Sequence, residues 1–156
     1  MKTYIGTKII QAEGAVRIDG KEVQPPDWPI PCGSKVEDGY RVRYSDGYES
    51  WSPKDAFDEA YRPMTGLTFG MAMEAAKKGC KVARKGWNGK GLYVIYRTGY
   101  PDGIPCNKNT ADAVGIPEGT LFKVRPYLQM KCVDDSFQMW LASQSDILEE
   151  DWEVVE

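Results

Sequence analysis

The sequence predicts an α+β fold: mainly antiparallel sheet packed with one principal helix, plus a small N-terminal module of β-hairpins and one helix. Three observations support this prediction. Short β-rich runs are joined by Asp-Gly turns in the first third of the chain. A helical pattern follows in each part, and Pro63 and Gly66 interrupt the chain between them. We therefore expect two domains, residues 1–65 and 66–156.

The N-terminal module is expected to begin with strands. The β-branched run at 4–10 predicts one strand, and the segments 16–18 and 21–23 flank the Asp19-Gly20 turn of a hairpin. Four prolines then make 24–32 an extended loop.

A second hairpin and a helix complete the module. The alternating run 40–44 and its return at 48–51 enclose Asp46-Gly47. Ser52 and Pro53 suit the N-cap and first turn of a helix that runs through Tyr61.

The second domain opens with its principal helix. Thr68 is the expected N-cap, apolar residues follow at helical spacing, and Gly79 ends the helix. A strand at 81–84, a glycine-rich turn at 86–91 and a strand at 92–97 follow.

The rest of this domain is expected to be a long loop and more strands. Residues 98–119 form a connection punctuated by Pro and Gly, longer than loops usually are unless they serve a function. Strands are expected at 121–124, 127–133 and 136–141, the last two joined by a turn. A short helical turn and a final strand occupy 145–156.

Composition excludes several classes of function. The 156 residues include 20 Lys plus Arg against 23 Asp plus Glu, so a protein that holds long nucleic acid by bulk charge is not expected. Histidine is absent, which removes imidazole bases and imidazole metal ligands. The four cysteines have no metal or dithiol spacing. No signal peptide or membrane-spanning run is visible, and we expect a cytoplasmic protein without metal or cofactor.

Charge is nevertheless segregated along the chain. Residues 77–90 hold six cations and no acid, whereas 146–156 hold six acids and no base. A local basic patch of this size suits a ligand with a few phosphates. The alternative is a solvated face whose lysines pair with the acidic tail.

Three short motifs combine side chains suited to a nucleotide. In the turn at 86–91, Trp87 offers a stacking plane and Asn88 an amide, although a core position for Trp87 is the alternative, and the Lys-Ser/Thr pair of a phosphate-binding loop is missing. The tetrad 107–110 and the corner 143–146 add amides and hydroxyls. Ordinary turn chemistry, and an N-cap at Ser145, are their alternatives. No spacing of acids indicates catalysis.

Residues 67–155 resemble the second type of the phage-encoded Thoeris anti-defence sponge family. The matching stretches, in family order, are LTFGMAMEAAKKGCKVARKGWNGKG at 67–91, GYPDGIPCNKNTADAVGIPEGT at 99–120, RPYLQMK at 125–131 and WLASQSDILEEDWEV at 140–154. The first domain resembles a small phage module without an assigned activity.

The resemblance implies a binder that is not an enzyme. Such proteins sequester cyclic ADP-ribose isomers made by TIR-domain immune enzymes in the cytoplasm of the infected bacterium, and some members also bind cyclic dinucleotides. Members are homotetramers with pockets between subunits. Two alternatives stay open: a phosphodiesterase or glycohydrolase that destroys the same signals, and an accessory module that binds a protein or nucleic acid.

Carried onto this chain, the family motifs mark the expected ligand-binding residues. Trp87 would stack adenine, Asn88 and Gln144 would bind base or ribose edges, and Asp146 would accept from ribose hydroxyls. Arg84 or Lys85 would neutralise phosphate. The full expected set is Arg84, Lys85, Trp87, Asn88, Asn107, Asn109, Thr110, Arg125, Tyr127, Ser143, Gln144 and Asp146.

Overall fold

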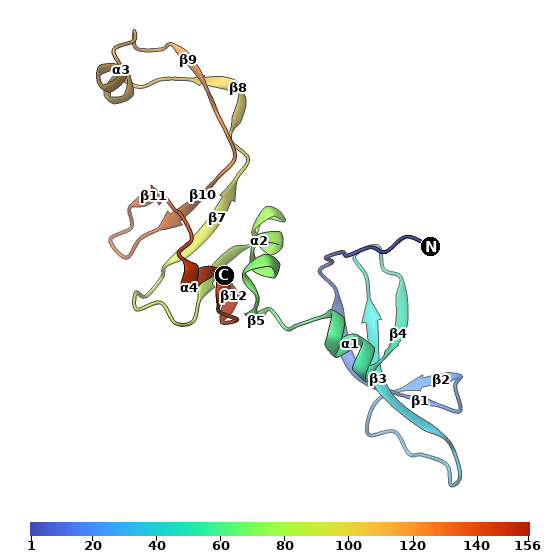
Figure 1. The fold of residues 1–156 in the computed structure, drawn as a ribbon. Coiled ribbons are helices and arrows are strands. Elements are labelled where there is room, and N and C mark those ends of the chain that lie inside the picture. Colours follow the sequence, from blue (N-terminus) through green and yellow to red (C-terminus); the bar gives the residue numbers. More distant parts are fainter. The chain divides into compact units, whose positions relative to one another are not determined.

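The structure, a computed structural model, describes residues 1–156 and consists of two compact units, Met1–Pro63 and Met64–Glu156 (Figure 1). Both units combine antiparallel strands with short helices, so the predicted α+β class is confirmed. None of the helices is long and apolar enough to cross a membrane.

The first unit is a four-stranded antiparallel sheet followed by one helix. Its strand order is β2-β1-β3-β4, and both predicted hairpins are confirmed. Gly20 and Gly47 adopt φ values of 72° and 84° at the two turns, a region that glycine enters without steric cost. Val42 is almost fully buried at the centre of the sheet. The elements are β1 (Gln11–Ile18), β2 (Glu22–Gln24), β3 (Val36–Arg43), β4 (Glu49–Pro53) and α1 (Lys54–Ala60).

Two local predictions in this unit are wrong. Residues 4–10 are irregular, and the first strand begins only at Gln11. β-branched residues favour a strand only where a neighbouring strand completes the hydrogen-bond ladder, and this segment has none. Pro53, not Ser52, is the N-cap of α1, and no side chain caps the helix because Ser52 is still part of β4.

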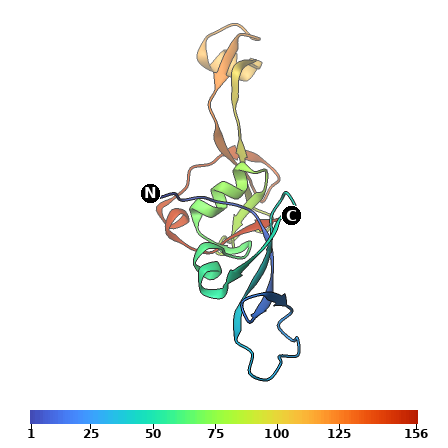
Figure 2. The ribbon, with the colours of Figure 1, turned by 90° about the vertical axis from the view of Figure 1, so that its right-hand side faces the viewer.

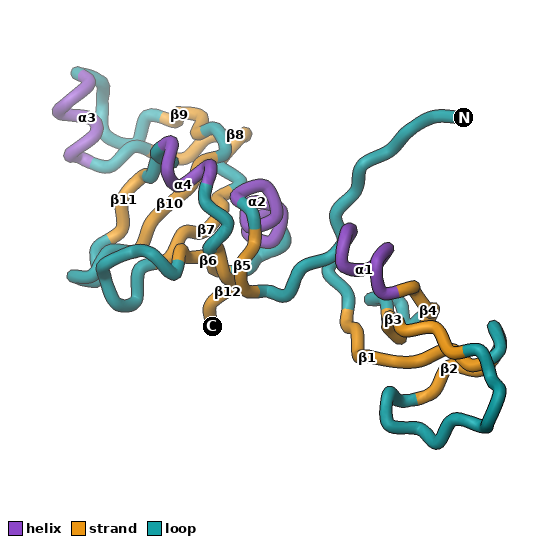
Figure 3. Tube along the Cα trace, turned by 60° about the horizontal axis from the view of Figure 1, so that its bottom comes forward, coloured by secondary structure: helices purple, strands orange, loops and turns teal.

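The second unit is built on a six-stranded sheet with the order β11-β10-β7-β6-β12-β5. Adjacent strands are antiparallel throughout. Helices α2 and α4 lie on one side of it (Figure 3). The elements are β5 (Thr65–Leu67), α2 (Phe69–Lys77), β6 (Lys81–Arg84), β7 (Tyr93–Arg97), β10 (Tyr127–Lys131), β11 (Phe137–Met139), α4 (Gln144–Leu148) and β12 (Trp152–Val155).

The core of this unit lies between α2 and the sheet. The Thr68 hydroxyl accepts from the Met71 backbone N–H at 3.3 Å, which confirms the predicted N-cap, and Gly79 ends the helix region with φ 96°. One face of α2 is made of alanines, which lets the helix approach the sheet closely. Its buried residues pack with Val82, Val94 and Trp152, each with no exposed surface.

The predicted loop at 98–119 is instead an ordered arm. It consists of β8 (Tyr100–Pro105), α3 (Lys108–Val114) and, after a turn, β9 (Leu121–Val124). β8 pairs with β9, and the ribbon projects from the ends of β7 and β10 (Figure 2). Cys106 and Ala111 are buried within it, which gives the arm a small core of its own.

Candidate ligand-binding site

Two segments that are far apart in the sequence meet where β6 ends and α4 begins. The Arg84 guanidinium donates from Nη1 to Asp146 Oδ1 at 3.0 Å, and the Trp87 indole N–H donates to the same oxygen at 3.1 Å. These contacts join the glycine-rich turn to the first turn of α4. We call this region the Trp87 corner; it comprises Arg84, Lys85, Trp87, Asn88, Ser143, Gln144 and Asp146.

The start of α4 is fixed by a capping box. The Ser143 hydroxyl accepts from the Asp146 backbone N–H at 3.2 Å, and the Asp146 carboxylate accepts from the Ser143 backbone N–H at 2.9 Å. The N-cap is therefore Ser143, and the alternative of a cap at Ser145 is wrong. Ser145 hydrogen-bonds the Ser143 hydroxyl at 2.9 Å.

Asp146 is a buried carboxylate with only 7% of its surface exposed. Burial alone would raise its pKa, but hydrogen bonds from the side chain and backbone of Ser143, from Arg84 and from Trp87 outweigh burial and lower the pKa to about 2. The side chain therefore stays ionised at neutral pH, and its oxygens are already occupied by donors.

Arg84 is held by a second carboxylate. Its Nε and Nη2 atoms donate to the two oxygens of Asp151 at 2.7 and 3.1 Å, a bidentate geometry, and Gly86 N–H donates to Asp151 at 3.0 Å. The hydrogen bond to Asp151 raises the pKa of Arg84, against the effect of burial, and lowers that of Asp151. With its charge compensated twice, Arg84 acts as a structural cation, and the free charge at the corner is that of exposed Lys85.

Trp87 is half-buried and belongs to a cluster of three indoles. Its ring centroid lies 5.9 Å from that of Trp140 and 5.4 Å from that of Trp152, both edge-to-face. The Trp152 indole donates to the backbone oxygen of Asp146 at 2.8 Å. Trp87 thus packs against the core and is still partly exposed. Asn88 follows it in the chain, Gln144 lies in the same first turn of α4 as Asp146, and both are exposed.

The other expected residues lie on or beside the arm, away from the Trp87 corner. Asn107 is the N-cap of α3, since its side-chain oxygen accepts from the Thr110 backbone N–H at 2.9 Å. Asn109 is exposed on the same helix. Arg125 is exposed between β9 and β10, and Tyr127 begins β10. A single chain therefore does not bring the arm residues and the corner together.

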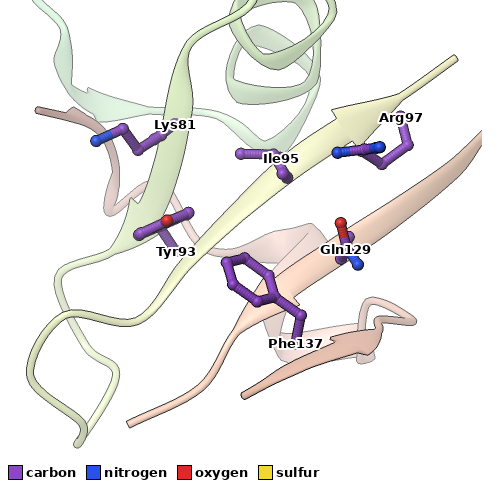
Figure 4. Close-up of a pocket in the computed structure, with 6 residues that line it drawn as sticks. All are labelled: Lys81, Tyr93, Ile95, Arg97, Gln129 and Phe137. Carbon is purple, nitrogen blue, oxygen red and sulfur yellow. The ribbon is translucent and has the colours of Figure 1, made fainter. Parts of the chain in front are cut away.

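A groove on the opposite side of the sheet was not predicted from the sequence. Figure 4 shows Tyr93, Ile95 and Arg97 along β7, with Lys81 on one side and Gln129 and Phe137 on the other. These residues line an open groove with a volume of about 480 Å³. The alternation of β7 places Val94 and Tyr96 toward α2 and the groove residues away from it. The sequence predicts only that alternation, because the remaining groove residues come from three other strands.

No group of three His, Cys, Asp or Glu side chains is arranged to hold a metal ion.

Comparison with known proteins connects the second unit to one family. Residues 67–155 match the Tad2-like family, the Thoeris anti-defense 2-like domain. Thoeris anti-defense 2 of Bacillus phage SP01 is 31% identical over 91 residues, which cover 58% of this chain and 97% of that protein. The match includes the glycine-rich turn, the arm and α4. The chain belongs to the Tad2-like family of Thoeris anti-defence proteins.

Proposed function

We propose that this protein is a sponge for a nucleotide immune signal: it binds a cyclic ADP-ribose isomer made by a TIR-domain enzyme and releases it unchanged. It would act in the cytoplasm of an infected bacterium. The observation that carries the proposal is the Trp87 corner of the Tad2-like domain. Hydrogen bonds hold its aromatic ring and its buried charges in place, and an exposed cation and exposed amides belong to the same corner.

The floor of the corner is rigid before any ligand arrives. Asp146 is bonded to Ser143, Arg84 and Trp87, and Arg84 is bonded to Asp151. A ligand that stacks on the exposed part of Trp87 would find its partners in place, which reduces the entropy lost on binding. A nanomolar sponge needs about −12 kcal/mol, so preorganisation of this kind matters.

The polar rim would supply recognition. Lys85 would neutralise a phosphate, and Asn88 and Gln144 would donate to and accept from base or ribose edges. Stacking on Trp87 would add ~1–3 kcal/mol. Asp146 has a smaller direct role than the sequence indicates, because its acceptors are already used by this chain's own donors.

The same geometry disfavours hydrolysis at the corner. A general base needs a pKa near the working pH and a free lone pair facing the substrate. Asp146, the buried carboxylate of the corner, has a pKa of about 2 and accepts from three residues. The corner is built to hold a ligand and not to take a proton from water.

We further propose that the working form is a homotetramer. Val114 and Leu121 of the arm are each 66% exposed, and a two-stranded ribbon is only marginally stable in water. Burial of the arm against another subunit would cover these side chains. It would also bring Asn109 and Thr110 to the corner of a neighbour, so that one pocket draws on two chains. A cyclic dinucleotide is the second ligand class for such a pocket.

Recovery of intact ligand tests the proposal. The full chain is incubated with a cyclic ADP-ribose isomer, freed of unbound ligand by gel filtration, and heated; mass spectrometry then identifies what is released. We expect the intact isomer in stoichiometric amount. Gln144→Ala and Asn88→Ala should each weaken binding roughly tenfold. Gln11→Ala, an exposed amide of the first unit, is the matched control and should bind as the parent does.

Two results would contradict the proposal. A linear product whose amount grows with protein and time would make the chain a hydrolase. Equal binding by Gln144→Ala, Asn88→Ala and Gln11→Ala would place the ligand away from the Trp87 corner.

A further inference from the structure

The face of the six-stranded sheet that is turned away from α2 carries an ordered grid of side chains. The strand registers set Tyr93 beside Lys131 and Lys131 beside Phe137 in one row. Ile95, Gln129 and Met139 form the next row, and Arg97 stands beside Tyr127 in the third. Neighbours within a row are about 5 Å apart, and successive rows lie about 7 Å apart along the strands, so a ligand as long as a nucleotide can reach from the first row to the third. We call this surface the open face.

Two cations that line the groove, Lys81 of β6 and Arg97 of β7, have no carboxylate partner. Lys81 lies 5.3 Å from the centroid of the Tyr93 ring, and Arg97 contacts the Tyr100 hydroxyl at 3.4 Å. Neither takes part in an ion pair, in contrast to Arg84 and Lys131, which are held by Asp151 and Asp135. Two uncompensated cations at the rim of a groove attract an anion, and Arg97 can bind a phosphate through two N–H groups.

The middle of the groove suits an aromatic base. Phe137 is 51% exposed and Tyr93 is half-buried, so both leave ring surface for stacking. Gln129 is half-buried, lies between Phe137 and Arg97 (Figure 4) and makes no side-chain hydrogen bond within the chain, so its amide is free to donate and accept. The volume of about 480 Å³ is within the range of small-molecule sites.

We propose that the open face is a second binding site, separate from the Trp87 corner, for a nucleoside monophosphate unit. The base stacks on Phe137 and Tyr93, Gln129 binds its polar edge, and Arg97 holds the phosphate, while Lys81 adds positive charge at the Tyr93 end of the groove. Sheets that bind single-stranded RNA present aromatic side chains and flanking cations in this manner. The unit is either a free nucleotide or one residue of a short single strand, because both offer the same base and phosphate.

This site does not depend on the proposed sponge activity. The groove residues point away from α2, whereas Trp87 packs against the core beneath α2 together with Trp152. No residue belongs to both sites. A ligand on one face therefore leaves the hydrogen bonds of the other face intact.

The test maps binding on the full-length chain with three probes: adenosine 5′-monophosphate, adenosine, and the RNA tetranucleotide of adenosine. Two-dimensional ¹⁵N TROSY spectra follow the amides of Tyr93, Ile95 and Gln129 during each titration. We expect the monophosphate to shift these amides and adenosine to bind roughly tenfold more weakly, because it lacks the phosphate. A tetranucleotide that binds more tightly than the monophosphate identifies a single strand as the source; equal affinity identifies the free nucleotide.

Variants separate the two sites. Arg97→Gln and Phe137→Ala should each weaken monophosphate binding about tenfold. Lys78→Gln and Leu141→Ala, exposed side chains outside the groove, are the matched controls and should bind as the parent does. Gln144→Ala at the corner should leave monophosphate binding unchanged. If the cyclic ADP-ribose isomer does not bind at all while the groove amides still respond to the monophosphate, the sponge proposal fails and this one stands.

Three results would overturn the second site. The first is no shift of the groove amides with either phosphate-bearing probe. The second is equal binding of adenosine and its monophosphate, unchanged by Arg97→Gln. The third is that the chemical shifts of the groove amides change with protein concentration but not with added probe. That result would mean that a second copy of the chain covers this face.

Discussion

The indole N–H of Trp87 donates to Asp146 Oδ1 at 3.1 Å across 59 positions of sequence, and this bond ties the glycine-rich turn to helix α4. The same oxygen accepts from Arg84 at 3.0 Å. One buried carboxylate therefore orients the two parts of the proposed binding corner. We therefore expect substitutions of Asp146 to disorder the Trp87 corner, and to weaken ligand binding as a consequence.

Asp146→Asn should destabilise the second unit by about 3 kcal/mol, because it removes the buried one of the two carboxylates that compensate the charge of Arg84. Chemical unfolding followed by tryptophan fluorescence measures this loss. Asp112→Asn is the matched control: its ion pair with Lys108 is exposed, and its removal should cost less than about 0.5 kcal/mol. Similar losses in both variants would mean that the buried ion pair contributes no more to the free energy of unfolding than the exposed one.

Acid should weaken the second unit in a defined range. The pKa of Asp146 is about 2 in the folded chain against an ordinary value of 3.8, so its contribution to stability is complete above about pH 4 and is lost as the pH falls toward 2. The lowered pKa of Asp151 acts in the same direction. The loss due to Asp146 is on the order of 2 kcal/mol. Asp146→Asn should flatten the dependence of unfolding free energy on pH below 4; a curve as steep as that of the parent would refute this assignment.

Substitutions of Trp87 should separate packing from hydrogen bonding. Trp87→Phe keeps a ring against Trp140 and Trp152 but removes the donor to Asp146, so we expect a loss of about 1–3 kcal/mol in stability. Trp87→Ala also removes the stacking surface and should reduce signal binding roughly ten- to a hundredfold. Calorimetric binding and thermal unfolding are measured on both variants. Binding that falls equally in the two would show that the hydrogen bond, and not the ring, governs affinity.

Gly99→Ala should disrupt the base of the arm. Gly99 has φ 74°, and an added Cβ would lie 2.3 Å from the Val124 backbone oxygen, so the ribbon must shift. Gly70→Ala is the control: it lies in α2 with no atom closer than 3.9 Å to the added Cβ, and the better helix former should raise stability by up to about 1 kcal/mol. Hydrogen exchange of the β8 and β9 amides reports on the arm; unchanged protection in Gly99→Ala would contradict this prediction.

The proposed assembly is tested by light scattering on the full-length chain. A homotetramer should have four times the 17.5 kDa chain mass. Leu121→Asp places a charge on the exposed apolar surface of the arm and should shift the protein toward smaller species. Leu148→Asp, also on an exposed leucine but on α4, is the control for added charge alone. A monomeric parent that binds the signal tightly would exclude a pocket shared between subunits.

Local patterns were sufficient for elements whose determinants lie within a few residues. The Asp-Gly hairpins, the Thr68 cap and the apolar spacing of α2 are correct predictions because turn geometry, helix capping and helical period depend on near neighbours. The β-branched run at 4–10 predicts a strand that is not present, because a strand also needs a partner strand that no local pattern supplies. The Pro and Gly residues of the arm predict a loop, but they flank a short helix that Asn107 caps and that ends at Gly115 with φ 75°.

The sequence by itself determined the α+β class, the family resemblance of residues 67–155 and the residue types at the Trp87 corner. Only the tertiary structure decided that the Asp146 carboxylate accepts hydrogen bonds from Ser143, Arg84 and Trp87. It also decided that the arm residues lie away from that corner. It alone assembled the groove from β6, β7, β10 and β11. The physical reason is the same in each case: burial, and the hydrogen bonds that burial requires, are set by strands and helices that meet in space from distant parts of the chain.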